Sequence, residues 1–271
     1  MPDQFQSGAK IPAGFTRHEY DINGLRTVVH TGGKGPPVVY WHGAGSWHGF
    51  DFAQSWLDRF QVIVPSHPGW GDSADAPAEM DSVGDYLLHY LDLFDKLGLK
   101  QFDLVGFSLG GWMASEFAVA HGHRLRKLVL VAPAGLADPA HPGPTSLGTT
   151  LQDMYGYIVG DLKALERHLP KTAEESAAHA AEVGREMQSA GRLFARGPFN
   201  PKLERWLHRA SMPTLLVWSK EDRLVPVGRS GKWLKYLPNA KLKTVERGGH
   251  LVLDENEEAR EAVAKFLSSV A

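Results

Sequence analysis

The sequence predicts an α/β protein built on a mixed, mostly parallel open β-sheet with helices on both faces. Three observations support this prediction. Short and nearly continuous Val/Leu/Ile runs recur along the chain, as expected of strands that are covered on both faces. Longer amphipathic stretches separate these runs and suit crossover helices. A hairpin signal lies near the start, which adds an antiparallel pair of strands.

The strands are expected at short apolar runs bounded by turn residues. The first two form a hairpin, because Asn23-Gly24 separates the two β-rich halves of the segment 15–31. The other strands are predicted at residues 36–41, 60–65, 102–107, 127–132, 213–218 and 240–245.

Helices are expected between these strands. In the segment 81–99 apolar residues recur at helical spacing, and Ser82 with Asp85 form a capping pair at its start. The segments 109–122 and 255–270 also have a helical pattern.

No strand is predicted over the stretch of about 75 residues from Gly135 to Ala210. It begins with a turn-rich loop and continues with predicted helices at 161–170 and 172–195. An insertion of this length in a compact domain is typically a lid over a site, although helices that only support the sheet would give the same pattern. We expect a core at residues 1–134 and 211–271 and a helical cap at residues 135–210.

The composition limits the classes of function. Of the 271 residues, 43% are hydrophobic and 22% charged, as in a soluble globular protein, and the net charge of −2 gives no attraction to nucleic acid or to an anionic membrane. The absence of cysteine excludes disulfides and thiolate chemistry. The first residues do not resemble a signal peptide, and no apolar stretch approaches the ~18 residues that span a bilayer. We expect a cytoplasmic monomer or homodimer that acts on a small molecule.

A serine nucleophile is indicated by the motif "GFSLGG" at 106–111, where Ser108 stands between a predicted strand and a predicted helix. A sharp strand-to-helix turn would project the serine from the sheet, and Gly106 and Gly110 would leave space for its strained backbone. The N-terminus of the following helix adds free N–H groups and positive potential. The alternative is a glycine-rich turn with an incidental serine.

A serine hydroxyl needs a base, and the base needs an acid that orients it. Among 13 histidines, His250 is the candidate base, because it lies in a glycine loop between the last strand and the last helix. Asp222, just past the carboxyl end of a predicted strand, is the candidate acid, and Asp138 is the alternative. The order Ser108, Asp222, His250 matches one known arrangement of the triad.

Backbone N–H groups of Ala44 and Leu109 are the predicted oxyanion donors, because the glycine loop "HGAG" at 42–45 and the serine turn both follow strands. His42, Trp47 and Trp112 are the candidates for the lining of an apolar substrate pocket.

The cap offers two cations near its end, Arg192 and Arg196. This pair could meet a substrate carboxylate, although a solvated helix face would look the same. The sequence contains no H-E-x-x-H pattern and no dinucleotide loop, so neither a metal nor an organic cofactor is expected.

Taken together, the motifs resemble the α/β-hydrolase fold superfamily along nearly the whole chain. The motifs that carry the resemblance are "HGAG" (42–45), "HPGWGDS" (67–73), "GFSLGG" (106–111), "EDRLVP" (221–226) and "GGH" (248–250). The resemblance implies an eight-stranded sheet with a cap inserted after the sixth strand, and a triad of Ser108, Asp222 and His250.

The sequence departs from the usual pattern of this superfamily in two places, at His67 and at Leu251. His67 stands where many members have Asp, and its role is open. Ser108 argues against the branches with an Asp nucleophile, the dehalogenases and epoxide hydrolases. Leu251 follows the predicted base, where the carbon–carbon hydrolases of aromatic degradation usually have Trp.

We therefore expect a serine hydrolase that cleaves a carboxylic ester of a small to medium, largely apolar substrate through an acyl-enzyme on Ser108. The same triad could cleave a lactone, an amide or a carbon–carbon bond of a diketone. A ligand receptor that keeps the fold with little turnover is the alternative from another class.

Overall fold

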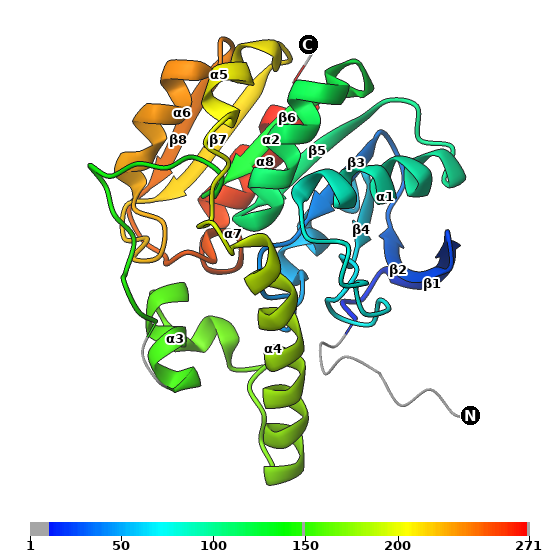
Figure 1. Cartoon of the computed structure of the whole chain (residues 1–271), viewed down its shortest axis with the longest axis vertical. Helices are drawn as coiled ribbons and strands as arrows, with labels where there is room; N and C mark the ends of the chain where they lie inside the picture. The colour runs from blue at the N-terminus through cyan, green and yellow to red at the C-terminus, as the bar shows by residue number, and fades with distance from the viewer. Residues whose placement is uncertain (1–10, 148–149, 270–271) are drawn as a thin grey trace.

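The computed structural model describes residues 11–147 and 150–269, and in these residues the chain forms an eight-stranded sheet of order β1-β2-β4-β3-β5-β6-β7-β8 (Figure 1). The pairs β1·β2 and β2·β4 are antiparallel, and all the others are parallel. The predicted fold class is therefore confirmed. The strands are β1 (Phe15–Ile22), β2 (Leu25–Gly32), β3 (Pro37–Trp41), β4 (Gln61–Pro65), β5 (Phe102–Phe107), β6 (Leu125–Val131), β7 (Thr214–Ser219) and β8 (Ala240–Val245).

The hairpin is formed at the predicted turn. Asn23 and Gly24 join β1 to β2 with φ angles of 53° and 83°, and Ile22 pairs with Leu25 across the turn. Positive φ at both central residues is the geometry that twists a two-residue turn to fit its strands.

The burial of each strand follows its position in the sheet. Every residue of β5 and β7 is buried, which explains their continuous apolar sequences. β8 forms an edge and is mostly exposed or half-buried, with Lys241 and Leu242 exposed. A lysine on an edge strand opposes pairing with another chain.

Helices cover both faces of the sheet (Figure 1). α1 and α2 lie together on one face, and α8 lies on the other face beside a short 3₁₀ helix at Asp51–Trp56, where Trp56 Nε1 donates to Arg260 O (3.3 Å). The predicted capping box at Ser82 and Asp85 begins α1. The helices are α1 (Val83–Lys96), α2 (Leu109–His121), α3 (Leu151–Ile158), α4 (Ala173–Leu193), α5 (Leu203–Trp206), α6 (Ser230–Tyr236), α7 (Val252–Glu255) and α8 (Glu257–Ser268).

The segment between β6 and β7, here called the inserted segment, carries α3, α4 and α5, and α3 and α4 project from one side of the sheet (Figure 1). Its two ends are joined, because Gly135 N donates to Pro198 O (2.9 Å) and Asn200 N donates to Gly135 O (3.0 Å). Its division from the core as a separate cap stays a prediction. No helix in the described part of the chain is both long and apolar enough to cross a membrane.

The predicted helix at 161–170 is wrong in extent, because only Leu162–Leu165 forms a 3₁₀ turn. The residues that follow bind the core instead. Arg167 and His168 both contact the carboxylate of Asp51, at 2.7 and 3.2 Å. These tertiary contacts override the local helical preference.

The backbone is closely packed at the turn from β5 to α2. A Cβ atom at Gly106 would lie 2.4 Å from Gly110 O, and one at Gly110 would lie 2.3 Å from Trp41 O. A Cβ atom at Gly111 would lie 2.7 Å from the Pro133 side chain. The glycines around Ser108 are therefore required for close approach of β3, β5 and α2.

Replacing Gly110 by Ala should destabilise the protein by about 1–3 kcal/mol, because the added methyl group would meet a backbone carbonyl rather than a flexible side chain. Gly191→Ala is the matched control, since a Cβ atom there contacts nothing within 4 Å. Gly191 lies inside α4, so its replacement should stabilise by about 0.5–1 kcal/mol. Urea unfolding of both variants measures these changes, and equal stabilities would contradict the crowding.

Candidate functional site

Ser108 occupies the turn with φ 50° and ψ −112°, a conformation outside the regions that L residues favour. Three backbone hydrogen bonds hold it there: Ser108 N donates to Val131 O (2.9 Å), and Ala134 N and Trp112 N donate to Ser108 O (both 3.0 Å). The side chain is half-buried. A residue held in a strained conformation by its surroundings is typical of a functional position.

Asp222 and His250 are joined by a buried hydrogen bond, from His250 Nδ1 to Asp222 Oδ2 (2.8 Å). The other carboxylate oxygen of Asp222 accepts from Leu224 N (2.9 Å) and Val225 N (2.8 Å). The loops after β7 and β8 are linked again where Ser219 Oγ donates to Gly248 O. The carboxylate of Asp222 is thus fixed in place. Its hydrogen bond to Nδ1 orients the imidazole of His250, so that Nε2 lies on the other side of the ring.

His250 lies beside the serine turn, since its ring is 4.8 Å from the ring of Phe107. Its Nε2 atom is buried and has no hydrogen-bond partner among the described residues. Hydrogen bonds between a nucleophile and its base are often long without substrate and tighten when substrate binds. The structure therefore brings the three predicted triad residues to one edge of the sheet.

Asp138, the alternative acid, and two further side chains, Glu221 and His121, lie in surroundings that differ from those of the triad. Asp138 binds His141 Nδ1 (2.9 Å) instead of His250. Glu221 is exposed beside the buried Asp222. His121 packs on the ring of Phe117 (5.2 Å) at the far end of α2.

The loop that carries Ala44 lies directly beside Ser108, because a Cβ atom at Gly43 would be 3.3 Å from Ser108 Cβ. Leu109 is the first residue of α2. Neither the Ala44 N–H nor the Leu109 N–H donates to another residue in the described part of the chain. Both N–H groups are thus free to donate hydrogen bonds to a bound oxygen atom.

His42 has both ring nitrogens engaged within the protein. Nδ1 bonds to Gly43 O (2.8 Å), and Nε2 accepts from His67 N (3.1 Å). His67 in turn bonds through Nε2 to His42 O (3.0 Å) and through Nδ1 to Tyr90 Oη. Burial lowers the pKa of both rings, that of His67 to about 3. These two neutral histidines join the ends of β3 and β4, which gives His67 a structural role.

Trp47 is buried against the inserted segment. Its ring lies 5.2 Å from Tyr155 of α3 and 4.9 Å from His179 of α4, and Tyr155 Oη bonds to His179 Nε2 (2.8 Å). Trp47 therefore connects the loop after β3 to both helices, and its place in a substrate pocket stays a prediction.

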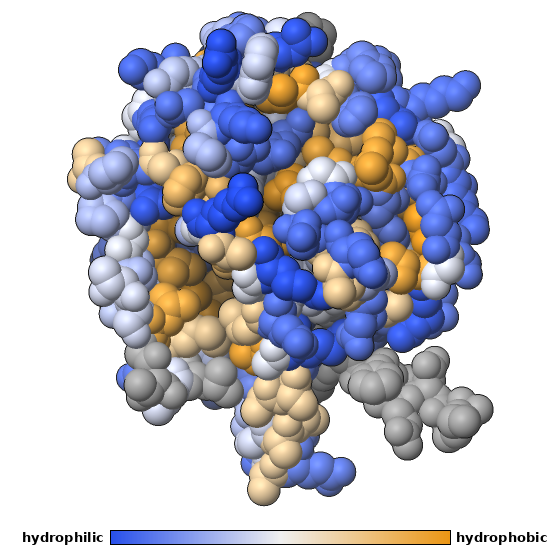
Figure 2. All heavy atoms as spheres, in the orientation of Figure 1, coloured by the Kyte–Doolittle hydropathy of each residue, from blue (hydrophilic) through white to orange (hydrophobic). Residues whose placement is uncertain are grey.

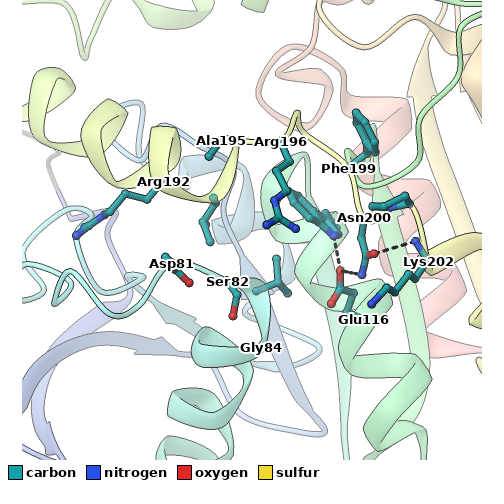
Figure 3. Close-up of a pocket in the computed structure, with 14 residues that line it drawn as sticks. Asp81, Ser82, Gly84, Glu116, Arg192, Ala195, Arg196, Phe199, Asn200 and Lys202 are labelled. Atoms are coloured by element: carbon teal, nitrogen blue, oxygen red, sulfur yellow. Dashed lines mark hydrogen bonds between the residues drawn. The ribbon is translucent and has the colours of Figure 1, made fainter.

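Trp112 lines a cavity of about 620 Å³ with Glu116, Asn200, Arg192 and Arg196 (Figure 3). Its Nε1 donates to Glu116 Oε1 (2.6 Å), which also accepts from Asn200 Nδ2 (2.9 Å). The described residues that line this cavity do not include Ser108, Asp222 or His250. Trp112 and the cap arginines are thus placed at a different opening from the triad.

A hollow with hydrophobic walls opens on the face drawn in Figure 2, between the extended segment after Gly135 and the upper end of α4.

Among the described residues, no group of three or more His, Asp or Glu side chains could hold a metal ion.

Glu255 was not singled out from the sequence, yet it joins the His250 loop to the inserted segment. Its carboxylate accepts from Gly249 N (2.5 Å), Gly160 N (2.8 Å) and Asp161 N (2.9 Å). Burial raises the pKa of this carboxyl group. Nothing in the local sequence distinguishes Glu255 from its acidic neighbours, because two of its three partners, Gly160 and Asp161, are remote in the chain.

His67→Gln should flatten the pH dependence of stability. His67 titrates near 6.5 when unfolded and at about 3 when folded, so its contribution is complete above pH 6.5 and is lost as the pH falls toward 3. The slope reaches about 1.4 kcal/mol per pH unit. Between about pH 4 and pH 6, unfolding of the variant in urea should therefore be accompanied by the uptake of about one proton fewer than unfolding of the wild type. The exposed His123→Gln is the control, and an unchanged slope in His67→Gln would contradict a neutral buried ring.

Similar curated proteins include two hydrolases from Pseudomonas putida. A 2-hydroxymuconate semialdehyde hydrolase is 29% identical over 248 residues, which cover 87% of this chain and 88% of the relative. A 2-hydroxy-6-oxo-2,4-heptadienoate hydrolase from strain F1 is 27% identical over 270 residues, which cover 91% of this chain and 94% of the relative.

Solved structures share the fold at lower identity. A membrane phospholipase A described as a bacterial virulence factor superposes with a TM-score of 0.78 at 22% identity, covering 94% of this chain and 86% of its own. The 2-hydroxy-6-oxo-6-phenylhexa-2,4-dienoate hydrolase from Rhodococcus sp. strain RHA1 has a TM-score of 0.74 at 22% identity, with 94% and 99% covered. The model of the alpha/beta hydrolase family matches residues 38–266, and the chain belongs to this family.

Proposed function

We propose that the protein is a serine hydrolase in which Ser108 is the nucleophile, His250 the general base and Asp222 the acid that orients the base. The observation that carries this proposal is the buried 2.8 Å bond between Asp222 and His250, next to a serine in a strained turn at the start of a helix. A nucleophile, an oriented base and free backbone donors at one place are the requirements of acyl transfer.

In the proposed reaction, Ser108 Oγ attacks a carbonyl carbon while His250 Nε2 takes its proton. The Ala44 and Leu109 N–H groups bind the oxyanion, each worth about 3 kcal/mol in the transition state. The leaving group then departs with the proton from His250, and water releases the acyl group from Ser108 as a carboxylic acid. Asp222 stabilises the imidazolium in both steps.

One candidate bond is a carbon–carbon bond beside a ketone, and it is supported by the relatives. Their names describe substrates that combine a carboxylate with an oxo or aldehyde group. Attack of Ser108 on such an oxo carbon would leave an acyl-enzyme, and the departing carbon would take the proton from His250.

The other candidate is a carboxylic ester of an apolar substrate, and it is supported by the surroundings of the triad. Phe107 and Leu251, which flank the nucleophile and the base in the chain, are buried and apolar. Arg192, one of the two arginines that could have met a substrate carboxylate, binds the carbonyl oxygens of Ala76 and Pro77. An uncharged acyl group suits such surroundings better than a carboxylate does.

Labelling with a fluorophosphonate tests the nucleophile. The intact mass should increase by one adduct, and peptide mapping should place it on Ser108. Ser108→Ala should take up no label and lose nearly all turnover, because the residual rate comes from binding and the oxyanion donors alone. An adduct on another residue, or turnover retained in Ser108→Ala, would refute the assignment.

Asp222→Asn should lower the rate of labelling by about 10³–10⁴-fold, because an amide presents a donor where the carboxylate accepts and so favours the wrong imidazole tautomer. Glu221→Gln is the matched control at the neighbouring exposed position and should label like the wild type. A small effect at Asp222 would show that another acid orients His250.

A substrate panel distinguishes the two bonds. p-Nitrophenyl esters of increasing acyl length are compared with 2-hydroxy-6-oxo-dienoates that end in methyl or phenyl groups. If the substrate is an uncharged ester, kcat/KM should rise with acyl length and the dienoates should react slowly. Faster turnover of a dienoate would select carbon–carbon hydrolysis instead.

A further inference from the structure

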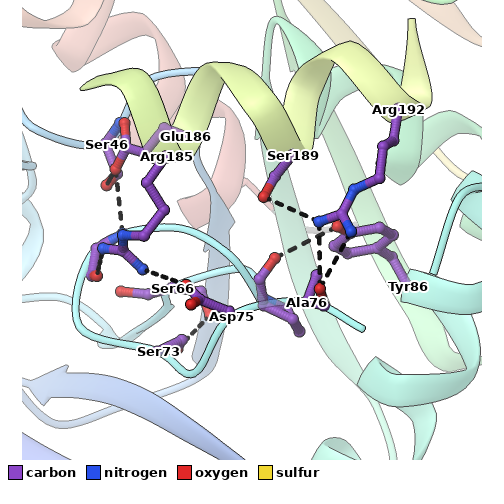
Figure 4. A network of polar contacts seen from close by, with 12 residues as sticks. Ser46, Ser66, Ser73, Asp75, Ala76, Tyr86, Arg185, Glu186, Ser189 and Arg192 are labelled. Carbon is purple, nitrogen blue, oxygen red and sulfur yellow. Dashed lines mark hydrogen bonds and ion pairs between the residues drawn. The ribbon is translucent and has the colours of Figure 1, made fainter. Parts of the chain in front are cut away.

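Glu186 is a fully buried carboxyl group on α4, at the point where this helix crosses the core (Figure 4). Its Oε2 accepts from Ser46 N (2.9 Å). Its Oε1 accepts from Ser46 Oγ and from Gly71 N (3.1 Å). One side chain of the inserted segment thus binds two separate loops of the core.

Both loops lead to Ala44. Ser46 follows Ala44 by two residues, and Trp70, which precedes Gly71, donates from Nε1 to Ala44 O (2.8 Å). Ser46 O also accepts from Gly49 N (2.9 Å), which closes the loop on its other side. Glu186 therefore binds Ser46, which follows the Ala44–Gly45 peptide group, and Gly71, which follows the tryptophan that donates to Ala44 O.

Two arginines also attach α4 to the core, and neither contacts the 44–46 loop directly, although Arg185 shares Gly71 with Glu186. Arg185 binds Asp75 (3.2 Å) and the carbonyl oxygen of Gly71. Arg192 binds the carbonyl oxygens of Ala76 and Pro77 at 3.2–3.3 Å. Docking of the helix and fixing of the 44–46 loop are thus carried by different side chains of α4 (Figure 4).

The position of Glu186 is costly for stability. Burial raises its pKa to about 7, so the folded state binds a proton more strongly than the unfolded state does. Its contribution to stability is therefore greatest at low pH and falls as the pH rises toward 7. A group kept at such a cost is a candidate for a functional role.

We propose that Glu186 is a positioning residue: through Ser46 and Trp70 it sets the direction of the Ala44 N–H, so that this oxyanion donor is in place only while α4 lies on the core. This inference rests on the function proposed above. It makes the assembly of the oxyanion site depend on the inserted segment.

The test compares the rate of fluorophosphonate labelling of Ser108 in Glu186→Gln, Glu186→Ala and Arg192→Ala. The amide of Glu186→Gln would point a donor at an N–H donor, and the loss of one placed oxyanion contact should lower the labelling rate by about 10- to 100-fold. Arg192→Ala loosens the same helix but should keep the rate within about two-fold of the wild type. Thermal unfolding shows that each variant is folded.

Ser46→Ala provides a milder variant that removes one donor to Glu186 and leaves the carboxyl group in place. Its labelling rate should fall less than that of Glu186→Ala, and combining it with Glu186→Ala should add little further loss, because both changes act on one contact. Additive losses would contradict a shared path through Ser46.

The outcomes separate the two proposals. If wild-type Ser108 takes up no label, the proposed function fails, and this inference fails with it. If the wild type is labelled, and both Glu186→Gln and Glu186→Ala are labelled as fast as the wild type, only the positioning role is refuted. If Arg192→Ala loses as much as Glu186→Ala, general docking of α4 replaces the specific role of Glu186.

Discussion

Backbone atoms of β3, β5 and α2 approach so closely at the Ser108 turn that three positions around it accept no Cβ atom without a clash. This contact places the start of α2, and with it Leu109, next to the loop after β3 that carries Ala44. The strained backbone of Ser108 is stabilised by its bonds to β6 and to the residues after it. The loops after β7 and β8, which carry Asp222 and His250, reach the same end of the sheet as the serine turn, and the His250 ring packs beside Phe107 there.

Two carboxyl groups, one buried (Glu186) and one half-buried (Glu255), connect the inserted segment to this arrangement. Glu186 extends from α4 to the loop of Ala44, and Glu255 extends from α7 to backbone groups after α3 and to the loop of His250. Burial raises the pKa of both groups. The inserted segment therefore contacts the loops of the predicted oxyanion donor and of the predicted base, and these contacts are polar and directional, unlike simple apolar packing.

The parts of the molecule that depend on local sequence were predictable, and those that depend on remote partners were not. The Asn23-Gly24 hairpin, the Ser82 capping box and the turn at Ser108 each follow from a few adjacent residues. The ring bonds of His42 depend on His67, 25 residues away, so its structural bonding was not visible beforehand. Glu186 left one signal: it continues the helical spacing of the buried face of α4, where apolar residues would be expected. Its partners, more than a hundred residues earlier in the chain, left none.

The paired ends of the inserted segment also bear on how the chain folds. Pairing of β6 with β7, as between Val131 and Val217, closes a loop that contains the whole segment. The bonds of Gly135 to Pro198 and Asn200 divide this closure into two smaller steps. The first step joins the two ends of the inserted segment, and the second step closes only the short stretch from Asn200 to β7. Slow, long-range contacts limit folding rates, so early joining of these ends would favour completion of the sheet. The strands that precede Asp222 and His250 would thus form late, after the helices of the inserted segment.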